Sequence, residues 1–385
     1  MDFSKTKVLV TDGGGRQTLT ILHGLKQLGC KIGLLCAHKL DLGYFSRLPD
    51  YKILDQRASP RHEDFISFVT DTIRQNQYDI LLPVAEMSTN VVTSHEDELK
   101  KFVRLACAPR ASYINAFDKQ KTFDLAFQMG IPSPRTRLAN QPVEEFLNVA
   151  TFPLIIKPRN GMGSIGFHKF EKREDFKPYL QEHNINIDDY VLQEFVDYEK
   201  RLGTILFVDQ TGEVCMAYAD EVLRWYPIDA GSACLIRSID YPEIIDASAR
   251  LLKAMNWQGV AALSFMVDRF TNEPKLLEIN GRIPASIRLS WQCGFNVAKL
   301  LLEMACGEEV HGYPVNTVFG QMTRHFHAEI PWFIHSPTRF SCKPSWFSWK
   351  NTRDVVFWWD DPLPWFAYTV QKMIGYQEFK KKRQH

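Results

Sequence analysis

Short apolar runs alternate with helical patterns over the first 110 residues of the chain. The run Lys7–Val10 ends at Asp12-Gly13-Gly14-Gly15, after which leucines recur at helical spacing until Gly29. Strands that are buried on both faces of a parallel sheet read as nearly continuous apolar runs. The pattern therefore predicts a doubly wound α/β sheet, a Rossmann-like domain over residues 1–110. The expected strands are 7–10, 31–36 and 79–84, and 65–73 is an expected helix.

The pattern changes after residue 110. A helical pattern at 116–129 is stopped by Gly130 and Pro132. Strand and helix patterns then mix in an order that suits two α+β lobes, a small one and a larger one whose strands include 205–209, 260–268 and 275–279 and whose last helix is 298–305. The predicted units are 1–110, 111–197 as the small lobe, 198–310 as the large lobe with a metal site, and 311–385 as an aromatic C-terminal extension with a basic tail.

Composition narrows the function classes. Hydrophobic residues make up 45% of the 385 residues and charged residues 24%, which is typical of a globular protein and excludes a mostly disordered chain. The 46 Lys and Arg nearly balance the 45 Asp and Glu, so nothing indicates a nucleic-acid binder. The eight cysteines form no CxxC pair, and no apolar run reaches the ~20 residues of a membrane span. We therefore expect a cytoplasmic protein with reduced thiols.

The glycine turn after the first strand is one candidate site. Glycines there let backbone N–H groups meet an anion at a helix N-terminus. A dinucleotide site needs GxGxxG, whereas Arg16 and Gln17 follow the glycines here. This departure disfavours an NAD-dependent reductase and leaves a tight turn as the simpler interpretation.

A strand lysine and a glycine loop form a second candidate. Lys157 lies on the predicted strand Leu154–Pro158, and Asn160-Gly161-Met162-Gly163-Ser164-Ile165-Gly166 follows. The lysine gives a point charge for a polyphosphate, and the loop lets backbone amides close over the outer phosphates. No GK[ST] enters a helix, so this is not a Walker A motif. A glycine-rich hairpin with a lysine that reaches solvent is the alternative.

Two further segments could contribute to the same chemistry. Glu278 and Asn280 are two residues apart on a predicted strand and so point to one face, where their oxygens suit Mg²⁺. Arg282 follows and can meet phosphate oxygens. Tyr190–Val196 is a strand whose backbone could present polar groups to an adenine ring, although taken alone an ordinary edge strand is the simpler interpretation.

The order of these segments, after a Rossmann-like domain, resembles the ATP-grasp superfamily over about residues 5–310. The glycine at 281 is more similar to its carbamoyl-phosphate-synthase-like and D-aspartate-ligase-like branch than to biotin carboxylase. The resemblance implies ATP and Mg²⁺, with Arg282 as the catalytic residue that neutralises the transferring phosphoryl group. It implies that Glu278 and Asn280 hold the metal. The implied nucleotide contacts are Lys119, Lys157, Gly161, Gly163, Ser164, Glu194 and the backbone of Phe195 and Val196.

Two positions depart from the family pattern. Ser264 stands where many relatives carry an acidic or amide metal ligand, so we consider Asp268 as a substitute. Lys200 stands where the ribose-binding acid usually falls, and its neighbour Glu199 is the candidate for that role. A shift by one residue would place Glu199 on the opposite face of the strand.

The resemblance implies an ADP-forming ligase that joins a carboxylate to an amine or thiol through an acylphosphate. An ATP-binding regulatory or assembly protein without turnover remains the alternative. The small-molecule substrates of an open sheet lie beyond the carboxyl ends of its strands. We therefore expect the acid and the amine in the cleft between the two units, with Arg288 binding a carboxylate and Glu86 receiving the amine. Alternatively, Glu86 only caps a helix that begins near Ser88.

The last 75 residues contain six of the nine tryptophans. The segment Trp358–Phe366 and the basic run Lys380–Arg383 suit a weak peripheral contact with an anionic membrane. A cap that packs its aromatic side chains on the ligase body is the simpler alternative. The oligomeric state and the identity of the acid and amine are not set by the sequence.

Overall fold

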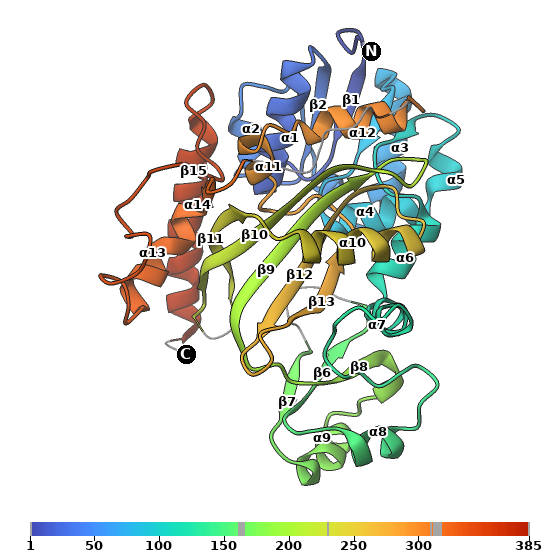
Figure 1. Cartoon of the computed structure of the whole chain (residues 1–385). Coiled ribbons are helices and arrows are strands. Elements are labelled where there is room, and N and C mark those ends of the chain that lie inside the picture. The colour runs from blue at the N-terminus through green and yellow to red at the C-terminus, as the bar shows by residue number, and fades with distance from the viewer. Residues whose placement is uncertain (1, 161–165, 229–230, 309, 311–317, 384–385) are drawn as a thin grey trace.

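A computed structural model describes residues 2–383 except 161–165, 229–230, 309 and 311–317. The described residues form three sheets with helices packed on them (Figure 1). The N-terminal sheet and the small sheet of the lobe around β6 lie at opposite ends of a large, strongly curved sheet (Figure 1). In the described part of the chain, the helices lack the combination of length and apolar character that crossing a membrane requires.

The N-terminal sheet is parallel throughout, in the order β3-β2-β1-β4-β5. This confirms the predicted parallel sheet. The exposed edge strand β3 was missed because its Tyr-Lys-Ile-Leu sequence has no continuous apolar run. The elements are β1 (Lys7–Val10), α1 (Arg16–Gln27), β2 (Lys31–Cys36), α2 (Leu42–Phe45), β3 (Tyr51–Leu54), α3 (Phe65–Asn76), β4 (Ile80–Leu82), α4 (Glu86–Ser94), α5 (Glu96–Leu99) and β5 (Arg104–Leu105).

The next segment contains two short helices where the sequence predicted one. The chain leaves the helical conformation at Asp118, whose side chain accepts a hydrogen bond from the amide of Gln120 and caps the second helix. A three-stranded antiparallel sheet follows, in the order β7-β6-β8. The elements are α6 (Arg110–Phe117), α7 (Lys119–Gln128), α8 (Val143–Val149), β6 (Leu154–Pro158), β7 (His168–Phe170), α9 (Phe176–Glu182) and β8 (Tyr190–Glu194).

The large sheet has the order β13-β12-β9-β10-β11-β14-β15. Alternate side chains of its long strands point to opposite faces. One face packs on α10, with Leu202, Leu206 and Leu263 in the same buried cluster as Leu251 and Leu252. The elements are β9 (Tyr198–Val208), β10 (Val214–Tyr226), β11 (Ser232–Ile239), α10 (Pro242–Ala254), β12 (Gly259–Asp268), β13 (Pro274–Asn280), α11 (Arg288–Gln292) and α12 (Val297–Ala305).

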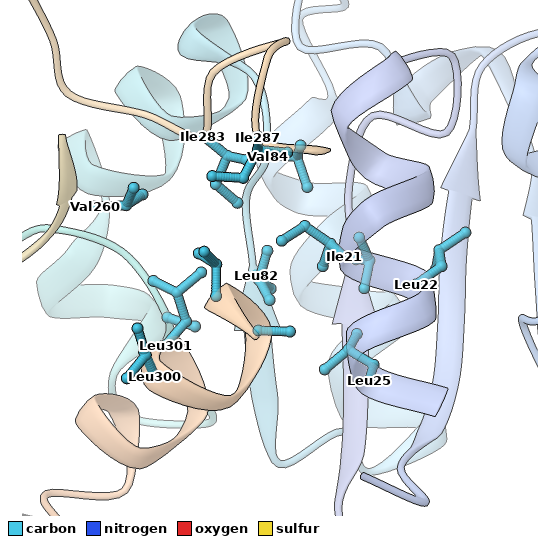
Figure 2. Close-up of a cluster of buried hydrophobic side chains, with 14 of the residues drawn as sticks. Ile21, Leu22, Leu25, Leu82, Val84, Val260, Ile283, Ile287, Leu300 and Leu301 are labelled. Atoms are coloured by element: carbon cyan, nitrogen blue, oxygen red, sulfur yellow. The ribbon is translucent and has the colours of Figure 1, made fainter. Parts of the chain in front are cut away.

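The other face of the large sheet shares a core with the N-terminal domain. Figure 2 shows Ile21 and Leu25 of α1 beside Leu82 of β4. Leu300 and Leu301 of α12 belong to the same buried cluster. Val260 of β12 belongs to the same buried cluster. Because this core is continuous, the carboxyl ends of the N-terminal strands are held against the large sheet.

The C-terminal region extends the large sheet. β14 (Met322–Arg324) pairs with β11, and β15 (Thr352–Asp354) pairs with β14. The sheet therefore crosses the expected boundary at residue 310, and the region is packed on the body together with α13 (Phe326–His335) and α14 (Leu363–Arg383).

A buried ion triad fixes this region to the sheet. Glu329 of α13 lies 2.7 Å from Nη1 of Arg224 on β10 and 2.8 Å from Nε of Arg324 on β14. All three side chains are at most 2% exposed. Burial raises the pKa of Glu329, and the two guanidinium groups oppose this rise.

We predict that Glu329→Gln lowers the free energy of unfolding by about 3–5 kcal/mol, because it leaves two buried guanidinium groups without a counter-charge. Denaturant unfolding of the full chain measures the loss. Asp246→Asn is the control, since Asp246 and its partner Arg250 form an exposed pair on α10, and its effect should stay within about 0.5 kcal/mol. Equal stability of the two variants would contradict the role of the triad.

Candidate functional site

The metal-ligand candidates lie at the end of β13. Nδ2 of Asn280 donates to Oε1 of Glu278 at 3.2 Å, and Nη2 of Arg282 donates to Oδ1 of Asn280 at 3.2 Å. The predicted common face of Glu278 and Asn280 is thus present. All three residues line a cavity of about 620 Å³ between the large sheet, α4, α6 and α7. The cavity is also lined by Gln17, Ala85, Glu86, Tyr113, Phe117, Lys119, Arg201, Tyr226, Ser232 and Ala285.

Lys157 reaches from β6 of the small lobe to the same strand. Its Nζ donates to the carbonyl of Leu277 at 3.1 Å and lies 4.7 Å from the centre of the Phe123 ring. Burial lowers the pKa of Lys157 to about 8, Lys119 adds to this lowering, and Glu278 opposes it. The lysine is therefore close to both the second lysine and the carboxylate of β13.

Lys119 is the first residue of α7 and lines the cavity. Its backbone amide donates to the carbonyl of Arg159 at 3.0 Å. The preceding Asp118 accepts two hydrogen bonds from the Arg159 guanidinium, at 2.6 and 3.1 Å. This two-point contact ties the start of α7 to the end of β6, and so positions both lysines relative to each other. Sequence reasoning placed Lys119 inside a helix and missed this link.

Glu86 lies in the cavity, at the start of α4. Its Oε2 is 3.8 Å from Nε of Arg282. Burial raises the pKa of Glu86, and Glu278 adds to the rise while Arg282 and Lys119 oppose it. The helix begins at Glu86 itself rather than near Ser88. Glu86 is therefore in the first turn of the helix, and it also lines the cavity.

The candidate adenine-binding segment follows β8. Oε1 of Glu194 accepts from the amide of Thr151 at 2.8 Å and lies 3.8 Å from Nε of Arg135. The amide of Phe195 donates to the carbonyl of Pro153 at 2.9 Å, so that amide is already used within the fold. Val196 is buried. The role of this segment stays a prediction.

Other nucleotide candidates are placed as follows. Glu199 is exposed and lies 3.3 Å from Nζ of Lys200, which leaves its ribose-binding role a prediction. Gly161, Gly163 and Ser164 of the glycine loop lie outside the described residues.

Asp268, the predicted substitute for the ligand absent at Ser264, has both carboxylate oxygens engaged elsewhere. One carboxylate oxygen lies 2.7 Å from Nζ of Lys275, and the other accepts from the amides of Phe270 and Thr271. The hydrogen bond from Lys275 is the main cause that lowers the pKa of Asp268 to about 2. Asp268 is four residues along β12 from Ser264, the register partner of Glu278, and so it stabilises the β12–β13 turn instead.

Arg288, which is predicted to bind a substrate carboxylate in this cleft, is not among the residues that line its two cavities. Its guanidinium lies 3.2 Å from the centre of the Trp358 ring, and the opposite stacking partner of that ring is His23, at 3.5 Å. Burial lowers the pKa of Arg288 to about 9. Arg288 thus contacts Trp358 of the C-terminal region, and the other face of the Trp358 ring contacts His23 of α1. Trp358 is therefore buried rather than available to a membrane surface, whereas Trp359 is 86% exposed.

A second cavity of about 240 Å³ lies beside the first, and sequence reasoning named Ser264, Asn280 and Arg282 of its lining but not Arg201 or Asp220. Arg16, Arg201 and Asp220 line it. Two signals were present. Arg16 directly follows the glycine turn, and Asp220 interrupts the apolar sequence Val214–Ala219. The glycine turn after β1 thus opens onto this site, with Arg16 beginning α1.

The oxygens of Glu278 and Asn280 fit a magnesium ion. Mg²⁺ prefers oxygen ligands and is commonly held by one or two carboxylates together with substrate phosphates and waters. In the described residues no three His, Cys, Asp or Glu side chains gather in one place. An ion at β13 would therefore take most of its ligands from phosphates and water, with Lys119 and Lys157 nearby.

Known proteins resemble this chain in sequence and in fold. A family model described as "ATP-grasp in the biosynthetic pathway with Ter operon" matches residues 232–327. A carbamoyl-phosphate synthase of Methanobrevibacter smithii is 22% identical over 231 residues, 56% of this chain and 58% of the relative. The chain thus spans little more than half the length of that relative.

Two solved structures share the fold. A biotin carboxylase–β,γ-ATP complex from Campylobacter jejuni has a TM-score of 0.68 at 15% identity and covers 83% of this chain and 75% of its own. The biotin carboxylase domain of 2-oxoglutarate carboxylase from Hydrogenobacter thermophilus, with MgADP, ADP and bicarbonate, has a TM-score of 0.67 at 14% identity and covers 82% and 72%.

We predict that Trp358→Ala lowers the free energy of unfolding by about 3–5 kcal/mol, since it removes a buried ring between His23 and Arg288. Trp359→Ala is the matched control and should change stability by less than about 0.5 kcal/mol, because this neighbouring ring is exposed. Denaturant unfolding distinguishes the two. A small loss for Trp358→Ala would mean that the stack does not hold the C-terminal region.

Proposed function

We propose that this chain, which is similar to ATP-grasp proteins in sequence and in fold, is an ATP-dependent ligase that joins a carboxylate to an amine or thiol through an acylphosphate. The observation that carries this proposal is a cavity lined by Lys119 and the Glu278-Asn280-Arg282 group. Lys157 lies beside this group, with its Nζ on the carbonyl of Leu277 and its charge interacting with those of Glu278 and Lys119. Two small-lobe lysines and a carboxylate–amide–guanidinium group on the large sheet form the charge pattern that a nucleoside triphosphate and a divalent cation require.

The proposed chemistry asks mainly for positioning and charge neutralisation. Phosphoryl transfer needs little covalent participation by side chains. Lys119 and Lys157 bind the phosphates of ATP, and Arg282 faces the oxygens of the group that moves to the substrate carboxylate. When bound at Glu278 and Asn280, Mg²⁺ supplies the positive charge that offsets the charge of adjoining phosphate oxygens.

We place the acid and its acceptor between the N-terminal domain and the large sheet. Glu86 and Arg282 are already 3.8 Å apart there, and Arg16 and Gln17 reach the same region from the start of α1. Arg288 has no part in this arrangement.

The alternative function is ATP binding without turnover. The specific observation in its favour is Ser264, which stands directly across from Glu278 in the β12–β13 register and offers a hydroxyl instead of a carboxylate. Release of ADP and phosphate from Mg²⁺-ATP, measured against panels of acids and amines, separates the two functions. Nucleotide binding with no release under any pairing would favour the non-catalytic alternative.

We predict that Lys157→Ala weakens ATP binding or slows turnover at least about tenfold, because a charge-assisted hydrogen bond of about 1.5–3 kcal/mol is lost. Calorimetric titration with ATP and a steady-state assay measure the two effects. Lys177→Ala is the control, since Lys177 is an exposed lysine of the same lobe that pairs with Glu144. Unchanged affinity and turnover in Lys157→Ala would remove the lysine from the nucleotide site.

We predict that Glu278→Gln abolishes Mg²⁺-dependent turnover and leaves the fold intact, because it keeps the volume of the side chain and removes the charge that holds the cation. A titration of activity against Mg²⁺, with thermal unfolding as a check, measures this. Asp268→Asn should retain the normal Mg²⁺ dependence and lose only stability, since its partner is Lys275. Normal Mg²⁺ dependence in Glu278→Gln would mean that the metal lies elsewhere.

A further inference from the structure

The second cavity of about 240 Å³ adjoins the proposed phosphate cavity. Arg201, Ser232, Asn280, Arg282 and Ala285 line both. The second cavity extends from this shared wall across the face of the large sheet that is opposite to α10, toward Asp220 of β10. A ligand in the second cavity would thus lie next to Arg282, the proposed site of phosphoryl transfer.

A row of directly paired residues on four neighbouring strands runs from the first cavity along the floor of the second: Glu278 lines the first cavity, and Ser264, Gly203 and Asp220 line the second. Glu278 pairs with Ser264, Ser264 pairs with Gly203, and Gly203 pairs with Asp220. Directly paired residues share one face of a sheet, so the two carboxylates lie at the ends of the row. At about 4.8 Å per strand, their backbones are roughly 14 Å apart.

The two residues between the carboxylates are small, and this creates the hollow. A Cβ atom at Gly203 would lie only 3.0 Å from a carboxylate oxygen of Asp220. Ser264 fills little of the space beside it. Larger side chains at these two positions would therefore fill the path from the phosphoryl end at Glu278 to the carboxylate of Asp220.

Asp220 is a buried acid with an incomplete environment. It is 6% exposed. Among the described residues, no group donates a hydrogen bond to its carboxylate and no cation pairs with it, although the carboxylate lines the cavity. A carboxylate buried without a counter-charge is costly to the fold, and such a group beside a cavity is therefore a candidate for a functional site.

We propose that this second cavity binds the acceptor substrate as a cationic amine, with Asp220 as the counter-charge of its ammonium group. The inference rests on the proposed ligase function and selects an amine over a thiol or an anionic acceptor. A thiol carries no charge to match Asp220, and an anion would be repelled by it. A cavity of ~150 Å³ holds benzene, so this one suits an amine of about amino-acid size.

The same carboxylate can take the proton that the amine must lose. One N–H proton of the ammonium group passes to Asp220, and the freed lone pair forms the C–N bond to the acyl carbon. The C–O bond to phosphate then breaks, phosphate leaves with its electron pair, and a second N–H proton passes to phosphate or water. Burial raises the pKa of Asp220 to about 7, which suits proton transfer near neutral pH.

The other titratable groups around Asp220 do not replace this role. Tyr218 lies two residues away on the same face, and its own pKa is raised by burial. His325 is neutral, because burial lowers its pKa to about 2. Arg16 and Arg201 line other sides of the cavity, so an acceptor that also carries a carboxylate is complementary to it.

The test uses the full chain with Mg²⁺-ATP and two kinds of acceptor. Hydroxylamine, which is small and uncharged near neutral pH, reports acylphosphate formation as a hydroxamate. A panel of primary alkylamines and amino acids reports use of a cationic acceptor. Asp220→Asn should form hydroxamate at the wild-type rate within about twofold, whereas its KM for the amine should rise on the order of 10- to 100-fold. Asp246→Asn on exposed α10 is the control for both.

Two further measurements distinguish a functional role from a structural one. The wild-type kcat/KM for the amine should rise with pH through about 7 as Asp220 ionises, and Asp220→Asn should lack this rise. Asp220→Asn should also melt at a higher temperature than the wild type. A carboxyl group whose pKa is raised by folding costs stability as pH increases, so this difference should grow between about pH 4, where the group ionises in the unfolded chain, and about pH 7, and should level off above pH 7.

The outcomes separate the two proposals. If the wild type forms hydroxamate and Asp220→Asn has an unchanged KM for the amine, the inference about Asp220 is wrong and the ligase function stands. A lower melting temperature of Asp220→Asn with equal losses for hydroxylamine and amine would show a structural role and also overturn it. If the wild type forms no hydroxamate with any acid and releases no ADP, the ligase function fails and this inference fails with it.

Discussion

The alternation of side chains along the long strands of the large sheet is the constraint on which the site depends. One face must be apolar to pack on α10, and the other must hold charged groups beside a cavity. Because the period of a strand is two residues, the side chains of Leu202 and Leu263 pack in the α10 core. The neighbouring positions, Gly203 and Ser264, face the cavity. A shift of one residue in the register of β12 would exchange the two sets, so the site and the core are specified together.

The N-terminal domain contributes to the site through packing. Its shared core with α12 and the large sheet includes Ile21 of α1 and Leu82 of β4 (Figure 2). Arg16 begins α1, and Glu86 begins α4 just after β4. Holding these two elements therefore places the two polar side chains at the cleft, where Arg282 meets Glu86. The site thus lies between the two units, and each of them contributes only some of its residues.

Local patterns were sufficient for some residues and insufficient for others. The common face of Glu278 and Asn280 follows from a spacing of two on one strand, and the structure has it. The surroundings of Arg288 could not be read from its neighbours in sequence, because they come from the distant Trp358. Asp268 lies four residues along β12 from Ser264, and its partners are the local amides of the β12–β13 turn and Lys275. Asp220 could not be assigned, since its relation to Glu278 depends on the pairing of four strands that the sequence does not state.

Burial shifts three charged groups of the cleft in the direction of neutrality. It raises the pKa values of Glu86 and Asp220 and lowers that of Lys157. These shifts share one cause, the removal of water from groups that lack sufficient counter-charge in the protein alone. A lysine short of negative charge lies at the phosphate end of the cleft, and a carboxylate short of positive charge lies at the other end. An anionic ligand would supply the negative charge at the lysine end, and a cationic ligand would supply the positive charge at the carboxylate end. This arrangement along the sheet suits a reaction in which an anionic phosphoryl donor and a cationic acceptor approach one substrate carboxylate from opposite sides.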